Sequence, residues 1–377
     1  MSVEPDTKDW TWVLDRPCPE CGFDAGVVTR ADLPGSIVAN AEGWRQALLR
    51  AGVTERPRPG VWSPAEYACH VRDVHLLFEE RLRLMLDQDD PSFANWDQDV
   101  TAVEQRYDLQ DPAVVGPELV DAAARVASTY ASVAEGRWGR VGRRSNGSVF
   151  TVESLGRYHL HDVVHHLWDV GFDPAEATMG AYDGAAADYA AGRVAMPDPV
   201  AEVVARFADR LAPGARVLEI GSGGGRDADA LEAAGLSVRR TDAVLAFVTL
   251  LRGRGLDADQ VDPVRDDLSD PAMPGRPFDA VWANASLLHV ERSRLSVVLG
   301  RLAEVTGPGG VLRMTVKEGD GDAWSVHGRV EAPRRFTFWR EGPLRGVLDA
   351  AGWDVDAVTS LPGDRGERWL DVTAVRR

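Results

Sequence analysis

Apolar residues recur at helical spacing through roughly the first 170 residues of the chain. Between residues 36 and 51 they fall three or four positions apart, so one face of a helix carries them. These positions are Ile37, Ala41, Trp44, Leu48 and Ala51. A second helix is expected from Ser63, because this capping serine precedes Pro64 and Glu66. With further helical patterns near 116–135 and 151–169, the sequence predicts a four-helix bundle.

The pattern changes to alternating helices and strands from about residue 201 onward. Strands are expected near 216–219, 237–241, 279–284, 310–315, 354–359 and 369–375. This alternation predicts a doubly wound α/β sheet. We therefore expect a multidomain α and α/β protein with four parts. They are a lead-in (1–34), the bundle (35–172), a linker containing a helix (173–200) and the sheet domain (201–377).

A glycine-rich turn follows the first strand of the sheet domain. The strand carries Glu219 near its end, and Gly221, Gly223 and Gly225 follow. Glycines there tolerate positive φ and let a ligand lie against the backbone. Asp242 ends the second strand, at a spacing suited to binding a ribose diol. These features alone fit several nucleotide cofactors.

Two later motifs narrow the choice. The run FDAVWANASLLHV at 278–290 and Gly-Pro-Gly-Gly at 307–310 follow the glycine turn in order. With that turn, they resemble class I S-adenosylmethionine-dependent methyltransferases, in particular the branch acting on small molecules. The resemblance implies a Rossmann-like, seven-stranded sheet whose last strand is antiparallel, between the fifth and sixth.

The methyltransferase resemblance also implies roles for individual residues. Glu219 and the three glycines would shape the cofactor turn, and Asp242 would bind the ribose. The remaining candidates are Asp267 near the adenine, Leu268 against its ring, Asn284 and Ala285 at the reacting centre, and His289 as a base or orienting group. Alternatives stay open: Glu219 as a cap of the turn, Asp266 in place of Asp267, and His289 as a packing residue.

Histidines in the predicted bundle form a candidate metal site. His161 and His165 are four residues apart and so share a helix face, and His70 falls on the inward side of the second helix. Imidazoles from facing helices can hold Zn²⁺ or a similar divalent ion. The segments at 62–70 and 161–165 resemble the DinB-like bundles, which include mycothiol S-transferases and the maleylpyruvate isomerase amino-terminal domain. That resemblance implies a metal triad of His70, His161 and His165; the alternative is a bundle whose histidines only form hydrogen bonds.

The three cysteines of the chain are Cys18, Cys21 and Cys69. Cys18 and Cys21 resemble one knuckle of a zinc ribbon, but no second Cys-x-x-Cys follows, so a Cys₄ site within one chain is excluded. A mixed Cys/His site, a redox pair and two unrelated thiols stay open. A structural or inert role is favoured.

Composition limits the partners. The 377 residues carry a formal net charge of −17, which argues against nucleic acid as a partner, since phosphate backbones are bound by basic surfaces. Neither a signal sequence nor an apolar stretch of membrane-spanning length is seen, so we expect a cytoplasmic protein without a membrane partner.

These features predict a methyltransferase that uses S-adenosylmethionine and a small acceptor, with a low-molecular-weight thiol as the leading candidate. A divalent metal, zinc by preference, would activate that acceptor in the bundle. The alternatives are an O- or N-methyltransferase with a structural or dimerising bundle, a metal-dependent thiol S-transferase with an accessory methyl-donor domain, and a non-catalytic sensor of S-adenosylmethionine. Whether the chain forms a homodimer stays open.

Overall fold

The computed structural model describes residues 10–192, 198–326, 330–363 and 365–377. The chain divides into two compact units. The first comprises Met1–Pro174 with Gly321–Ala323, and the second comprises Ala175–Asp320 with Trp324–Arg377.

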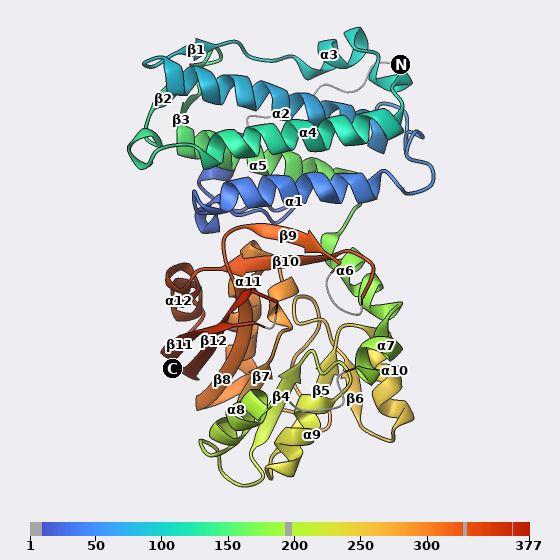
Figure 1. Ribbon diagram of the computed structural model, residues 1–377, viewed down its shortest axis with the longest axis vertical. Coiled ribbons are helices and arrows are strands. Elements are labelled where there is room, and N and C mark those ends of the chain that lie inside the picture. Colours follow the sequence, from blue (N-terminus) through green and yellow to red (C-terminus); the bar gives the residue numbers. More distant parts are fainter. Residues whose placement is uncertain (1–9, 193–197, 327–329, 364) are drawn as a thin grey trace. The chain divides into compact units, whose positions relative to one another are not determined.

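The first unit contains the four expected helices, which lie side by side (Figure 1). They are α1 (Asp32–Ala47), α2 (Pro64–Asp87), α4 (Pro112–Ala131) and α5 (Val152–Asp169). The start of α2 agrees with its predicted cap, because Ser63 Oγ accepts a hydrogen bond from the Glu66 amide at 3.2 Å. The Glu66 carboxylate in turn accepts from the Ser63 amide at 2.8 Å. Two orphan amides of the first turn are thereby satisfied.

Smaller elements of the first unit were not expected from the sequence. They are η1 (Thr11–Leu14), η2 (Ala25–Val27), α3 (Gln98–Glu104), η3 (Tyr107–Leu109), η4 (Glu135–Arg137) and a three-stranded sheet of β1 (Ser92–Phe93), β2 (Val141–Arg144) and β3 (Val149–Thr151). The lead-in also packs into the bundle: Val13, Cys18 and Phe23 belong to the same buried cluster as Trp44 and Leu160. The lead-in is therefore part of the bundle core.

The second unit contains the expected doubly wound sheet. The strands of this sheet are β4 (Arg216–Ile220), β5 (Ser237–Asp242), β6 (Ala258–Gln260), β7 (Phe278–Ala283), β8 (Thr306–Glu318), β9 (Asp322–Ser325), β10 (Arg334–Trp339), β11 (Trp353–Pro362) and β12 (Arg368–Arg376). Of these, β9 begins in the segment Gly321–Ala323, which belongs to the first unit. Seven of them follow the order β11-β12-β8-β7-β4-β5-β6, with β10 and β9 attached to β8. As predicted, β12 is antiparallel to both of its neighbours, β8 and β11. The strands not anticipated were β6, β9 and β10.

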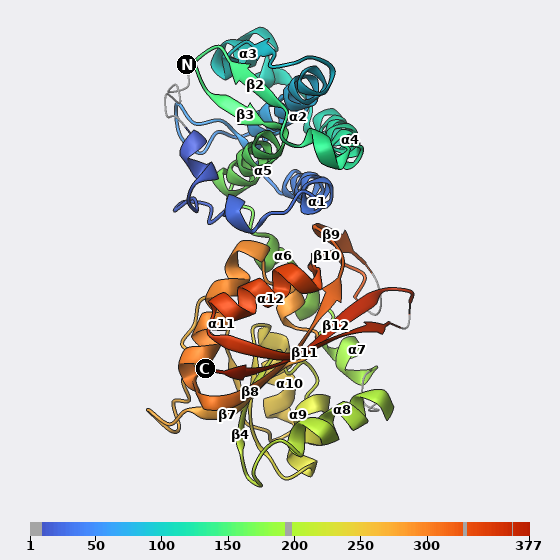
Figure 2. The ribbon, with the colours of Figure 1, turned by 90° about the vertical axis from the view of Figure 1, so that its left-hand side faces the viewer.

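Helices cover both faces of this sheet (Figure 2). They are α6 (Pro174–Asp183), α7 (Ala186–Ala191), α8 (Asp198–Ala208), α9 (Arg226–Ala233), α10 (Leu245–Gly253), η5 (Leu287–His289), α11 (Arg292–Val305) and α12 (Glu341–Ala350). Alternate strand residues point to opposite faces. Leu218 therefore packs with Leu295 of α11, whereas Val217 packs with Phe207 of α8.

The expected linker at 173–200 contains α6, α7 and the start of α8. No helix among the described residues is long and apolar enough to cross a membrane.

Candidate functional site

The turn after β4 brings the backbone close to neighbouring loops. Gly221, Gly223 and Gly225 all have positive φ, at 79°, 52° and 86°. A Cβ on Gly221 would lie 2.5 Å from Ser286 Cβ, and one on Gly225 would lie 2.6 Å from a Leu251 methyl. Both conformation and space therefore require glycine at these two predicted positions.

Asp242, at the end of β5, faces this turn. Its two carboxylate oxygens accept hydrogen bonds from the amides of Gly223 at 2.8 Å and Val244 at 2.9 Å. The side chain is held in one orientation beside the glycine turn, with further lone pairs for ligand hydroxyl groups. Burial raises the pKa of Asp242 to about 6. Its charge therefore changes near neutral pH.

Glu219 is 2% exposed in the strand that leads into the turn. Ser222 Oγ donates a hydrogen bond to its carboxylate. Burial raises the pKa of Glu219 to about 8, and the charges of Asp227 and Asp242 act in the same direction. Glu219 is therefore mostly protonated at neutral pH, and its contact with Ser222 also fits the alternative role as a cap of the turn.

Asn284 has both ends of its amide engaged by the protein. Its Nδ2 donates to Asp227 Oδ2 at 2.6 Å, and its Oδ1 accepts from Arg313 at 2.9 Å and from Thr315 at 2.9 Å. Ala285, which follows, has a φ of 54°, and its amide donates to Thr315 Oγ1 at 2.8 Å. The network fixes the backbone after β7 at the edge where ligands of open α/β sheets bind.

Asp267 is exposed, and its carboxylate accepts hydrogen bonds from the amide and hydroxyl of Ser269 at 2.9 and 2.8 Å. These bonds lower its pKa. Its neighbour Leu268 is buried in the same cluster as Ile220. Asp266 instead accepts from the Asp262 amide at 2.8 Å. Neither carboxylate is thus distinguished as an adenine ligand by its contacts.

His289 lies partly buried in η5, between Tyr182 and Phe336. Burial lowers its pKa to about 4, so the ring is neutral at pH 7. Nδ1 is 2.7 Å from the Arg335 carbonyl and therefore carries the proton, which leaves Nε2 to accept from the Tyr182 hydroxyl at 3.0 Å. His289 and Tyr182 form a hydrogen-bonded pair with one basic nitrogen.

Other residues at this site were not picked out from the sequence. Ala190 of α7 packs on the turn, because a Cβ on Gly224 would lie 3.1 Å from the Ala190 Cβ. The Ser286 hydroxyl is buried beside Gly221 and has no hydrogen-bond partner among the described residues. The serine follows Asn-Ala in the 278–290 motif, a position that could have drawn attention to it.

The predicted metal triad is divided between two groups in the first unit. His70 shares a group with Asp162 and His166, whose ligand atoms lie within 4.8 Å of one another. His70 Nε2 is 3.1 Å from His166 Nε2, and His70 Nδ1 is buried without a hydrogen-bond partner among the described residues. His161 and His165 belong to the other group. The prediction had the right helix but missed that positions 162 and 166 face His70.

The second group consists of Cys18, Cys21, His161 and His165. All four are buried, and their ligand atoms also lie within 4.8 Å of one another. Burial lowers the pKa of His161 to about 3 and raises the pKa of Cys21 to about 12. Of the readings left open for the cysteines, the structure brings together the mixed Cys/His set, and Cys69 is in neither group.

Comparison with protein families gives two matches. Residues 193–358 match a methyltransferase domain, and residues 43–170 match the DinB superfamily. The chain joins a DinB-superfamily domain to a methyltransferase domain. The sheet order and the glycine turn agree with the match of residues 193–358 to a methyltransferase domain.

Solved structures also resemble part of this chain. One is a 1,6-didemethyltoxoflavin-N1-methyltransferase of Burkholderia thailandensis, with a TM-score of 0.43 and 21% identity over 54% of this chain and 88% of that chain. Another is the magnesium protoporphyrin IX methyltransferase of Synechocystis, with a TM-score of 0.42 and 15% identity. The match covers 54% of this chain and 98% of that chain. These likenesses concern the fold alone. A comparison with curated proteins gave no match.

We predict that donor affinity depends on the charge of Asp242. Affinity for S-adenosylmethionine should rise from pH 5 to pH 7, because the carboxylate ionises near pH 6 and then accepts ribose hydroxyls more strongly. Asp242→Ala should weaken binding roughly tenfold to a hundredfold at pH 7. Calorimetry on wild type and Asp242→Asn tests this: a persistent pH dependence in the variant would exclude Asp242 as its source.

A second prediction concerns Glu219 and stability. A folded-state pKa of about 8 exceeds the ordinary value of 4.5, so the protonated form stabilises the fold below pH 4.5. This contribution is lost as pH rises through 8. Glu219→Gln should therefore unfold at a higher urea concentration than wild type at pH 9. Its urea midpoint should also fall less than that of wild type between pH 6 and 9. If the urea midpoints of both proteins fell equally with pH, Glu219 would not be the group that causes the loss of stability.

Proposed function

We propose that this methyltransferase transfers the methyl group of S-adenosylmethionine to a small-molecule acceptor, with a low-molecular-weight thiol as the leading candidate. The observation that carries the proposal is the arrangement around the glycine turn. Asp242, the turn amides and the Ser286 hydroxyl converge beside a backbone with no space for a Cβ at Gly221. A close-fitting cofactor with hydroxyl groups suits this arrangement.

The residues of the turn have distinct parts in this proposal. Asp242 would hold the ribose hydroxyls, and the amides at the start of α9 would face the methionine carboxylate. When bound, S-adenosylmethionine supplies an electrophilic methyl group on a positively charged sulfur. The protein then has mainly to align the acceptor and exclude water, so proximity supplies much of the rate.

His289 and Tyr182 are the candidates for handling an acceptor proton. The neutral His289 ring has Nε2 directed at the Tyr182 hydroxyl, and Nδ1 is fixed by the Arg335 carbonyl. A proton released by an acceptor could pass to Nε2 directly or through the Tyr182 hydroxyl. An acceptor that arrives already deprotonated would need no such step.

Two features support a small acceptor and, among small acceptors, a thiol. The net charge of −17 disfavours nucleic acid. The DinB-superfamily domain contains His70, Asp162 and His166, a set of two nitrogens and one carboxylate oxygen. Three protein ligands suit a divalent metal with an open position. His70 Nε2 faces the group, at 3.1 Å from His166 Nε2 and 3.9 Å from Asp162 Oδ1. A metal bound there would lower the pKa of a thiol and yield its thiolate.

The second candidate function is an O- or N-methyltransferase whose bundle is structural. The burial of bundle histidines outside both candidate groups favours this function. His75 and His159 are both buried, and His75 Nδ1 lies 2.9 Å from His159 Nε2. Such residues serve packing and hydrogen bonding without a metal.

Turnover separates the two functions. If the open group activates the acceptor, the double variant Asp162→Ala/His166→Ala should lose most thiol methylation, while S-adenosylmethionine affinity stays within about twofold. The measurement is S-adenosylhomocysteine release with a panel of thiol, hydroxyl and amine acceptors. Asp121→Asn, an exposed carboxylate on α4, is the matched control. Wild-type rates in the double variant would support the structural bundle, and absence of turnover with every small acceptor would overturn the proposed function itself.

A further inference from the structure

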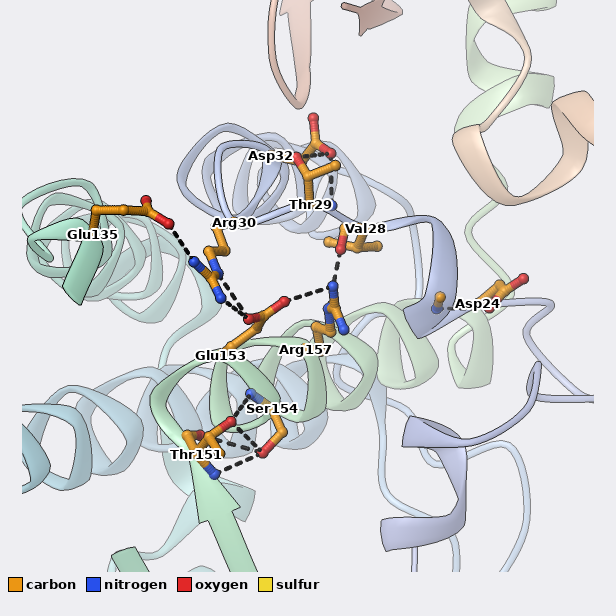
Figure 3. Close-up of polar contacts among 11 residues, drawn as sticks. Asp24, Val28, Thr29, Arg30, Asp32, Glu135, Thr151, Glu153, Ser154 and Arg157 are labelled. Atoms are coloured by element: carbon orange, nitrogen blue, oxygen red, sulfur yellow. Dashed lines mark hydrogen bonds and ion pairs between the residues drawn. The ribbon is translucent and has the colours of Figure 1, made fainter. Parts of the chain in front are cut away.

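The lead-in joins the bundle at two separate places. Near its end, Arg30 forms ion pairs with Glu153 of α5 at 2.7 Å and with Glu135 at 2.5 Å (Figure 3). Arg157 of α5 donates to the Val28 carbonyl at 3.0 Å and also pairs with Glu153. The second place lies further along α5, where Cys18 and Cys21 meet His161 and His165. Ion pairs hold the first contact, whereas the second combines apolar packing with two buried thiols and two buried imidazoles.

The cysteines are presented by a tight turn. The Gly22 amide donates to the Cys18 carbonyl at 2.9 Å, and the Cys18 amide donates to the Phe23 carbonyl at 2.8 Å. Gly22 has a φ of 75°, a conformation that glycine adopts without strain. Both sulfurs are thereby held toward α5, where His161 and His165 lie one turn apart on one face.

One distance within the group fits a tetrahedral site. Cys18 Sγ is 3.7 Å from His165 Nδ1. Zinc bonds of about 2.3 Å to sulfur and about 2.0–2.1 Å to nitrogen, set at a tetrahedral angle, separate two such ligands by about 3.6 Å. The pair is therefore about as far apart as two ligands of one ion.

The surroundings of the His165 and His161 rings also favour a metal ion between the cysteines and histidines. His165 Nε2 faces the carboxylates of Glu20 at 3.4 Å and Asp169 at 3.7 Å, which leaves Nδ1 toward the sulfur. Carboxylates that contact the outer nitrogen of a zinc-bound histidine commonly orient the ring. His161 is 3% exposed, and its Nε2 has no hydrogen-bond partner among the described residues. A buried nitrogen without a partner is costly unless a ligand occupies it.

We propose that Cys18, Cys21, His161 and His165 hold a structural zinc ion that fastens the lead-in to α5. On binding, the two thiols release their protons, and two thiolates with two neutral imidazoles balance the charge of Zn²⁺. The site then carries no net charge, as its burial requires. Four protein ligands close the coordination sphere, so this ion has no position for a substrate and differs from the open group at His70. The rings of Trp10 and Phe23 pack against the His161 ring, with centroids 5.6 and 5.5 Å away, and help to exclude water.

Metal content and cobalt spectroscopy on the full chain test this proposal. Zinc measured by elemental analysis should fall by one equivalent per chain in Cys18→Ser/Cys21→Ser, while His70→Ala retains that equivalent. Cys69→Ser controls for the loss of a buried cysteine outside the group and should also retain it. Binding of S-adenosylmethionine should be unchanged in a folded Cys18/Cys21 variant, which separates this test from that of the methyltransferase.

The wild-type chain provides a test that does not depend on a variant folding. Reloaded with Co²⁺ in place of zinc, it should show intense thiolate-to-cobalt absorption and the visible bands of tetrahedral cobalt. Cobalt bound without thiolate absorption would overturn the proposal. So would unchanged zinc content in the Cys18/Cys21 variant, or denatured wild type with only one reactive thiol, which would show a Cys18–Cys21 disulfide instead.

Discussion

The contact of Asp242 with the glycine turn is the interaction on which the proposed methyl-donor site depends. The Asp242 carboxylate accepts from the amides of Gly223 and Val244, and it thereby joins the ends of two adjacent strands. Its position is fixed before any ligand arrives, so little side-chain entropy is lost on binding. The same burial that fixes the carboxylate raises its pKa, and the site combines precise placement with sensitivity to pH.

In the bundle, helix α5 presents two ligand pairs one residue apart. His161 and His165 face the lead-in, whereas Asp162 and His166 face His70 on α2. A one-residue step rotates a side chain by about 100° around a helix, so the two pairs cannot serve one ion. We therefore propose separate roles for the two sets. A closed set with two cysteines suits a structural ion, and an open set with a carboxylate suits chemistry.

Periodicity was enough to predict the four helices and the sheet class, because each of these elements has a clear apolar pattern. The antiparallel last strand was expected from the resemblance to methyltransferases. Strand β6 was missed, since a three-residue strand has too short a pattern to be detected. The predicted triad of His70, His161 and His165 was divided because spacing alone does not tell which of two adjacent helix positions faces a given neighbour. The Cys18 and Cys21 partners come from a helix more than a hundred residues away, a separation that no local motif contains.

A crystal structure of the full chain with S-adenosylhomocysteine tests the role of Asp242 most directly. Ribose hydroxyls are expected within hydrogen-bonding distance of the Asp242 carboxylate, with the amino-acid end against the turn at Gly221–Gly225. A ligand bound elsewhere, with Asp242 contacting only the amides of Gly223 and Val244, would contradict this role.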